Sequence, residues 1–204
     1  MKKEHSLIHN YYHWIVVAVI MLMLLVYGGL LNNLGNLHLI PITEYLGITR
    51  AQFSLALNAK TLTSTLSTFI SGFLVARYGT RIMAPLGLVT ASAALFLLGN
   101  LTSYWMLIAG SLLYGIAYGF CATAGAVVIV RLWFHRHQGT VLGLITASTG
   151  LGSSLIAIIQ TAVMEATGTF RGSFYFGSAA LLVVAALVFI FVRSKPEDVG
   201  LAPY

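Results

Sequence analysis

One apolar stretch of the sequence places a lysine and three serines at the spacing of a single helix face. They are Lys60, Ser64, Ser67 and Ser71. Steps of four, three and four residues stack side chains on one side of an α-helix. A second, apolar stripe with similar spacing consists of Leu62, Leu66, Phe69 and Phe73. The pattern predicts a helix with one face toward lipid and the other toward a polar path or a neighbouring helix.

Lys60 is the candidate with the clearest chemistry. A cation inside a membrane span costs at least roughly 2.5–3.5 kcal/mol on insertion scales, and no acidic residue lies within an apolar segment to pair with it. A cation without a built-in partner could bind an anionic substrate. The alternative is that its long side chain reaches the membrane surface, since Lys60 lies about three turns from the predicted helix start.

Other polar side chains recur at helical spacing in the remaining apolar segments. Asn32 and Asn36 share one face, and their amides can either bind a carboxylate or hydroxyl, or link helices to each other. Tyr114 and Tyr118 are spaced for path lining or for packing. Thr146 lies within a stripe of small residues that favours helix contact over substrate contact. The small-residue stripe consists of Gly139, Gly143, Thr146, Gly150 and Ser153.

The composition shows which kind of element must position these side chains. Of the 204 residues, 58% are hydrophobic and 8% are charged, against about a quarter charged in a soluble domain. The mean hydropathy is +0.90. Too few polar residues are present to cover a soluble core, so the sequence predicts an integral membrane protein. The net charge of +6 comes from short connections rather than from a basic arm with aromatics, so nucleic-acid binding is not expected.

Six apolar segments are close to or above the roughly 20 residues that cross a bilayer as a helix. They run over Trp14–Leu39, Gln52–Val75, Ile82–Leu98, Trp105–Val130, Thr140–Met164 and Ser173–Val192. They are far too long for barrel strands, so the fold class is all-α: a polytopic bundle of six transmembrane helices over residues 1–192. The first segment exceeds a signal-peptide core and lacks a cleavage site, which favours a spanning helix.

The connections carry most of the charge. The longest is expected at 41–47, followed by a capping box, Thr49-x-x-Gln52, that begins the second helix. Six crossings put both termini on one side, with eight of the eleven Lys and Arg residues. The positive-inside rule predicts that this side, with the polar tail at 193–204, faces the cytoplasm. The expected location is the plasma membrane or a bacterial inner membrane.

The connection between the second and third segments resembles the signature of the major facilitator superfamily, roughly G-x-x-x-D-R-x-G-R. The matching residues are Gly72, Arg77, Gly79 and Arg81, with Arg81 one residue beyond the last Arg of the pattern, and Ala76 stands where the family usually has Asp. The resemblance implies that this loop takes part in gating on the cytoplasmic side. The missing Asp normally helps to hold that gate, so Ala76 weakens this part of the expectation.

Two further stretches resemble the oxalate/formate antiporter and monocarboxylate carrier branch of the superfamily. One begins RLWFHRHQGT at Arg131, and the other reads KPEDVGL from Lys195. The resemblance covers one six-helix half, built in such carriers from two inverted three-helix units. It implies a secondary transporter for a small organic anion, such as a mono- or dicarboxylate, working by alternating access. A second six-helix half or a homodimer partner would supply the opposite wall, and residues 193–204 would be the tail or the start of a linker.

The rival interpretation is a non-transporting membrane protein: a six-helix partner, an assembly protein or a truncated carrier product. Enzyme activity is not expected, because no nucleophile elbow, metalloprotease motif or P-loop is present. No cofactor or metal is expected either, since His135 and His137 lack nearby Cys or acidic residues and fit a hydrated basic loop. The single cysteine, Cys121, lies in an apolar run and is expected to be buried.

Overall fold

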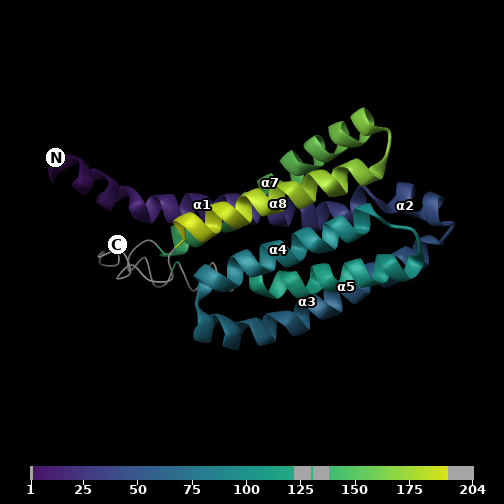
Figure 1. The fold of residues 1–204 in the computed structure, drawn as a ribbon, viewed down its shortest axis with the longest axis horizontal. Helices are drawn as coiled ribbons and strands as arrows, with labels where there is room; N and C mark the ends of the chain where they lie inside the picture. The colour runs from purple at the N-terminus through teal and green to yellow at the C-terminus, as the bar shows by residue number, and fades with distance from the viewer. Residues whose placement is uncertain (1, 122–129, 131–137, 193–204) are drawn as a thin grey trace.

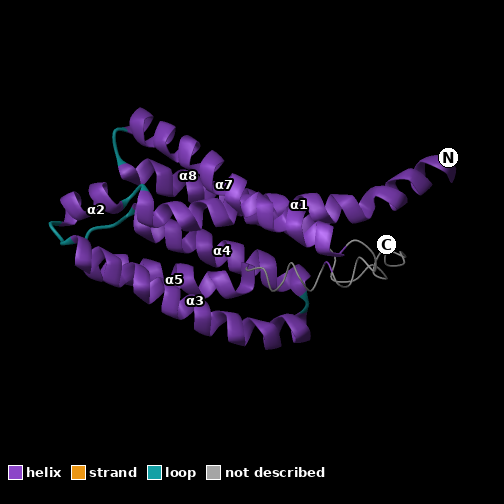
Figure 2. Ribbon diagram, turned by 180° about the vertical axis from the view of Figure 1, so that it is seen from behind, coloured by secondary structure: helices purple, strands orange, loops and turns teal. Residues whose placement is uncertain are grey.

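The structure is a computed structural model that describes residues 2–121, 130 and 138–192. Every regular element in these ranges is an α-helix (Figure 2). In chain order the helices are α1 (Lys2–Asn36), α2 (Leu39–Leu46), α3 (Arg50–Tyr78), α4 (Thr80–Gly99), α5 (Tyr104–Cys121), α7 (Gln138–Thr167) and α8 (Phe170–Phe191). The predicted all-α class is therefore confirmed for the described residues.

Five of the described helices are long and apolar enough to cross a membrane: α1 from Trp14, α4, α5, α7 and α8. Helix α3 has 29 residues, which exceeds the roughly 20 needed, but its many serines and threonines lower its hydropathy and it is not among the five. The fourth predicted segment is described only to Cys121 and at Val130. A crossing by α3, which would bring the number of crossings to six, therefore remains a prediction. The tail predicted at 193–204 lies outside the described residues and remains a prediction as well.

The connection expected at 41–47 is largely helical instead. Helix α2 occupies Leu39–Leu46 and ends at Gly47, whose φ of 63° is left-handed. Pro41 does not prevent this helix, because the first turn of a helix has no intrahelical partners for its N–H groups. The predicted capping box that begins α3 is confirmed. Gln52 N–H donates to Thr49 Oγ1 at 3.2 Å, and Thr49 N–H donates to Gln52 Oε1 at 2.9 Å.

The basic connection that resembles the family signature is a single residue long. Helix α3 continues to Tyr78, α4 begins at Thr80, and Gly79 between them has a φ of 78°. Glycine adopts this conformation without the strain of a side chain, which allows the reversal to take one residue. Gly72 and Arg77 therefore lie on α3 and Arg81 lies in the first turn of α4, rather than in an extended loop.

The helices pack as three main pairs, α3 with α5, α1 with α7 and α4 with α8, and α4 also packs on α5. Figure 1 shows α1, α7 and α8 as one group and α3, α4 and α5 as the other. The third and sixth predicted segments correspond to α4 and α8. Both are mostly apolar on all sides, which predicts positions at the lipid-facing edge of the bundle. In the structure α4 is the most buried of the five candidate spans and α7 the least. The packing faces of α4 are covered by α5 and α8, whereas much of α7 is open.

Glycines allow two of these pairs to approach at the backbone. A Cβ on Gly152 of α7 would meet the carbonyl oxygen of Leu25 on α1, and one on Gly29 would lie 2.5 Å from the oxygen of Gly152. On α5, a Cβ on Gly115 would strike Thr63 and one on Gly119 would strike Ser67 of α3. The four-residue spacing of Gly115 and Gly119 is typical of close helix packing, and both glycines lie at such a contact between α5 and α3.

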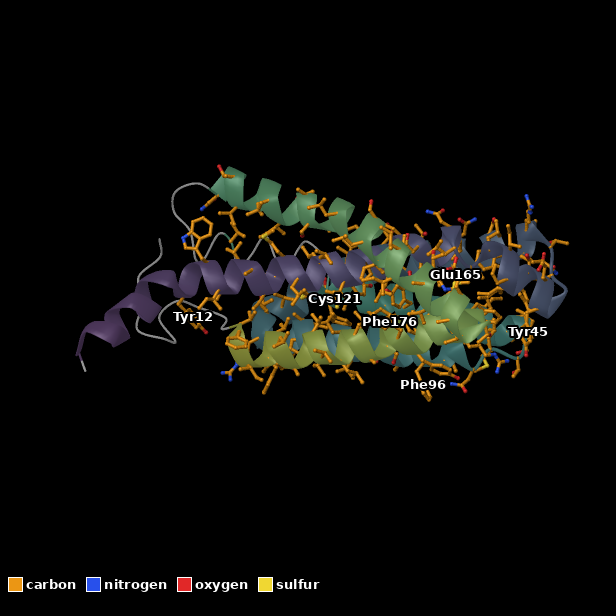
Figure 3. All side chains as sticks on the ribbon, turned by 90° about the horizontal axis from the view of Figure 1, so that it is seen from above. Tyr12, Tyr45, Phe96, Cys121, Glu165 and Phe176 are labelled. Atoms are coloured by element: carbon orange, nitrogen blue, oxygen red, sulfur yellow. The ribbon has the colours of Figure 1, made fainter. Side chains whose placement is uncertain are left out.

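The two ends of the bundle are joined by different contacts, and Figure 3 shows Tyr12 and Tyr45 at opposite ends. At one end the Tyr12 hydroxyl donates to the Phe191 carbonyl at 2.7 Å. At the other, Arg171 donates to the Tyr45 hydroxyl at 2.7 Å and to the Leu101 carbonyl at 3.0 Å. Arg171 thereby ties α2, the connection at 100–103 and the start of α8 together.

Candidate functional site

Two hollows on the surface of the bundle share one side chain, that of Tyr118 on α5. The larger has a volume of about 310 Å³ and is lined by Ser64, Thr65, Thr68, Phe69 and Tyr118. The smaller has a volume of about 170 Å³ and is lined by Leu24, Tyr27, Gly28, Leu31, Asn32, Tyr118 and Thr149. The larger reaches the lower end of the roughly 300–1,000 Å³ typical of small-molecule sites. Their walls come from α1, α3, α5 and α7, the four helices that the sequence predicts to face a path.

The three hydroxyl groups that α3 contributes to the larger hollow already donate to their own helix. Ser64 Oγ donates to the Thr61 carbonyl at 2.7 Å, Thr65 Oγ1 to the same carbonyl at 3.1 Å, and Thr68 Oγ1 to the Ser64 carbonyl at 2.7 Å. Side chains of this kind commonly bond back to the preceding turn. Each oxygen is left with lone pairs that can accept a hydrogen bond from a ligand.

The smaller hollow is closed by a polar contact between α1 and α7. Asn32 Nδ2 donates to Ser153 Oγ at 2.8 Å, and the neighbouring Asn33 Nδ2 donates to the Ser153 carbonyl at 3.0 Å. Thr149 Oγ1 donates to the Thr146 carbonyl at 2.6 Å. The helix-linking interpretation of Asn32 is therefore correct, and the same side chain also lines the hollow.

Tyr118 belongs to an aromatic cluster with Tyr27 of α1 and Tyr114 of α5. The rings of Tyr27 and Tyr114 stack with centroids 5.5 Å apart, and Tyr27 lies 6.3 Å from Tyr118. Tyr114 is fully buried, and its hydroxyl has no hydrogen-bond partner among the described residues. It lines neither hollow, so the structure favours packing over path lining for Tyr114.

Three residues of the predicted path, Ser64, Tyr118 and Asn32, line the hollows, and others do not. Lys60 is half-buried one turn before Ser64, outside both hollows, and no acidic group of the described residues acts on it. Asn36 and Thr146 are exposed away from the hollows. Ser67 and Ser71 are buried, and Ser67 donates to the Ile116 carbonyl on α5.

Two further residues of the smaller hollow were not predicted from the sequence: helical spacing from Thr146 indicates Thr149, whereas no spacing indicates Tyr27. Thr149 lies one turn after Thr146 and faces α1, where a Cβ on Gly28 would lie 3.3 Å from the Thr149 methyl group. Tyr27 lies five residues before Asn32, inside an entirely apolar run. Thr65 and Thr68, which flank the serine stripe, form more of the wall than the serines do, because α3 turns its serines toward α5.

The residues of the signature lie near the end of the bundle where Tyr12 meets Phe191. The Arg81 guanidinium lies 5.5 Å from the centre of the Phe189 ring on α8, and that of Arg77 lies 5.5 Å from the ring of its neighbour Tyr78. Gly72 faces open space. The role of these four residues in gating stays a prediction.

No group of three His, Cys, Asp or Glu residues that could hold a metal occurs among the described residues. The predicted hydrated loop at His135–His137 lies outside them. Cys121 is fully buried, as predicted, and its Sγ lies 3.8 Å from the Ala84 carbonyl oxygen.

Comparison with known proteins places these features in a family of transporters. Residues 11–203 match the Major Facilitator Superfamily. A probable 4-methylmuconolactone transporter of Cupriavidus pinatubonensis is 24% identical over 74% of this chain and 35% of its own length. A proton-coupled antiporter flippase, LtaA, of Staphylococcus saprophyticus is 25% identical over 92% of this chain and 45% of its own. The inner membrane protein YihN of Escherichia coli is 22% identical over 83% and 42%.

The chain spans less than half the length of the curated relatives it matches. Its match to the family pattern covers nearly all of its residues, and its helices are apolar enough for a multi-pass membrane protein. The relatives are named as transporters or membrane proteins and not as enzymes. The chain therefore belongs to the major facilitator superfamily of membrane transporters.

Proposed function

We propose that the chain forms one six-helix half of a secondary transporter for small organic acids. The observation that carries this proposal is the pair of hollows that share Tyr118, because together their walls come from α1, α3, α5 and α7. A polar wall on these four helices suits a transport path. A second half, or a second copy of the chain, would supply the opposite wall, and the two halves would rock around the site in alternating access.

The arrangement of helix pairs supports an inverted repeat of three helices. If α1, α3 and α4 correspond to α5, α7 and α8, the pair α1–α7 is equivalent to α5–α3, and α4–α8 is equivalent to itself. A two-fold axis between the two three-helix units would therefore make α1–α7 and α3–α5 equivalent and would pass between α4 and α8. These three pairs are the main packing contacts of the bundle. With α3 and the fourth segment both spanning the membrane, the chain crosses six times and both termini lie in the cytoplasm.

The acid substrate rests on Lys60 and on the resemblance to the oxalate/formate and monocarboxylate branch. Lys60 is half-buried at the edge of the polar face without an acidic partner among the described residues. It would attract an anion toward Ser64, one turn further along α3. The names of two relatives, a lactone transporter and a proton-coupled antiporter, are compatible with an organic substrate and with proton coupling.

Replacing Lys60 by Gln is expected to lower uptake of the transported acid at least tenfold in the complete carrier, because a hydrogen bond to a charged group contributes about 1.5–3 kcal/mol. Uptake of labelled oxalate, formate and lactate into proteoliposomes would measure this. Lys60→Arg keeps the charge and should retain most of the activity. Uptake of one of these acids that is equal in the wild type and in Lys60→Gln would remove Lys60 from the mechanism.

A further inference from the structure

The hydrogen bonds already made by the hydroxyl groups in the wall of the larger hollow determine whether it can hold an acid as the carboxylate or as the neutral carboxyl. Its hydroxyl groups on Ser64, Thr65 and Thr68 donate to backbone carbonyls, so they present acceptor lone pairs. A carboxylate carries acceptors alone. To bind one, these hydroxyl groups would have to give up their bonds to the helix.

Tyr118 is the exception in this wall. It is half-buried, lines both hollows, and its phenol makes no hydrogen bond among the described residues. A phenol can donate one hydrogen bond. The wall of the hollow thus combines one donor, from α5, with several acceptors from α3, and the Phe69 ring completes it.

We propose that Tyr118 and Thr65 form a subsite for a neutral head group that both donates and accepts a hydrogen bond, and that an acid occupies it as the protonated carboxyl. The carboxyl O–H donates to the acceptor oxygens on α3, and its carbonyl oxygen accepts from Tyr118. The carboxylate takes its proton from the aqueous phase on the side of entry, and the proton travels with it. This inference rests on the proposed transport of organic acids and adds the form in which the acid is bound.

Lys60 has a separate place in this scheme. It lies one turn before Ser64 and does not line either hollow. It would attract the anion to the mouth of the site, and the neutral acid would move past it. The hollow itself has no charged residue in its wall, so it offers nothing to offset the desolvation of a bare carboxylate.

Three probes of similar shape separate these possibilities: benzamide, benzoate and methyl benzoate, each added at pH 7 to the complete protein in lipid nanodiscs. Benzamide has both a donor and an acceptor, benzoate has acceptors with a charge, and the ester has acceptors alone. Binding would be measured by saturation-transfer NMR. We expect benzamide to bind at least tenfold more tightly than benzoate, and methyl benzoate not to compete with it.

Variants test the residues. Tyr118→Phe and Thr65→Val each remove one partner and keep the shape of the side chain, and each should weaken benzamide binding roughly threefold to tenfold. Thr61→Val is the matched control, since Thr61 is exposed on the same helix, bonds to the Leu57 carbonyl in the same way and lines neither hollow. It should bind benzamide as the wild type does.

Equal or tighter binding of benzoate, or benzamide binding that is unchanged in both Tyr118→Phe and Thr65→Val, would overturn the subsite. Binding of none of the three probes would overturn it as well. The uptake measurements on Lys60→Gln test the proposed function separately. Selective benzamide binding without transport of any acid would leave the subsite standing and remove the proposed function.

Discussion

Replacing Gly152 by Ala is expected to lower the free energy of unfolding by about 3 kcal/mol or more. A Cβ at this position would meet the backbone oxygen of Leu25 on α1, and a backbone cannot rotate away as a side chain can. Overpacking a tight contact typically costs 1–3 kcal/mol and occasionally more. The change forces α1 and α7 apart along the contact that Gly29 also makes. Denaturant titration of this chain in detergent micelles would measure it.

Gly150 provides the matched control on the same helix. It is exposed, and nothing lies within 4 Å of a Cβ built on it. Alanine at an open helical position is favoured over glycine by about 0.5–1 kcal/mol, so Gly150→Ala should stabilise the chain slightly. Equal effects of the two substitutions would mean that α1 and α7 do not approach as closely as described.

Acid is expected to destabilise the fold through His38, which lies between α1 and α2 beyond the membrane-spanning part of α1. It is fully buried, stacks on the Phe174 ring at 4.3 Å between centroids, and its Nε2 lies 2.7 Å from Ser173 Oγ. Its Nδ1 lies 3.4 Å from the Asn33 carbonyl. Burial lowers the pKa of His38 to about 4, and the bond to Asn33 opposes this only in part.

The sign follows from where the proton binds. An unfolded histidine has a pKa near 6.5, so between pH 6.5 and about 4 the unfolded chain binds a proton that the folded chain does not. Stability due to neutral His38 is complete above pH 6.5 and is lost as the pH falls, by about 3 kcal/mol in total. Denaturant titrations from pH 7.5 to 4 would show this slope.

The control for this effect is His38→Gln, which keeps hydrogen-bonding capacity without a titrating ring. Its starting stability is expected to be lower, but its slope against pH should be flatter than that of the wild type. Parallel slopes for the two proteins would show that other groups cause the acid sensitivity. No other histidine side chain is described in the structure, so any shared slope would come from elsewhere in the chain.

The features that could be predicted from the sequence are those fixed by local chemistry. The capping box at Thr49 and Gln52 depends on residues three apart, and it forms as expected. The close contact of Gly115 and Gly119 with α3 likewise fits their four-residue spacing on α5. The positions of the membrane helices follow from apolar length alone. The helix at 39–46 was not predicted, because residues 41–47 were expected to form a connection, whereas Pro41 lies in the first turn of a helix and does not prevent it.

The candidate site was only partly predictable, because helical spacing gives a face but not its direction. Lys60, Ser64, Ser67 and Ser71 do share one face of α3. Gly115 and Gly119 allow that face to pack closely against α5, which buries Ser67 and Ser71. The neighbouring threonines, Thr65 and Thr68, consequently line the hollow. Tyr114 and Tyr118 are four residues apart, but one is buried behind Tyr27 and the other lies at the hollow. This distinction depends on contacts between distant helices.

The central claim is that one face of α3 lines an aqueous path and the opposite face meets lipid. Thr65 lines the larger hollow, and Ile70, five residues later and 58% exposed, lies on the far side of the same helix. Single cysteines at these two positions, in a Cys121→Ala background of the complete protein in native membranes, can be tested with a charged, water-soluble thiol reagent. The account predicts rapid labelling at Thr65→Cys, slowed by a transported acid, and little labelling at Ile70→Cys. Equal labelling at both positions, or labelling at Ile70→Cys alone, would contradict it.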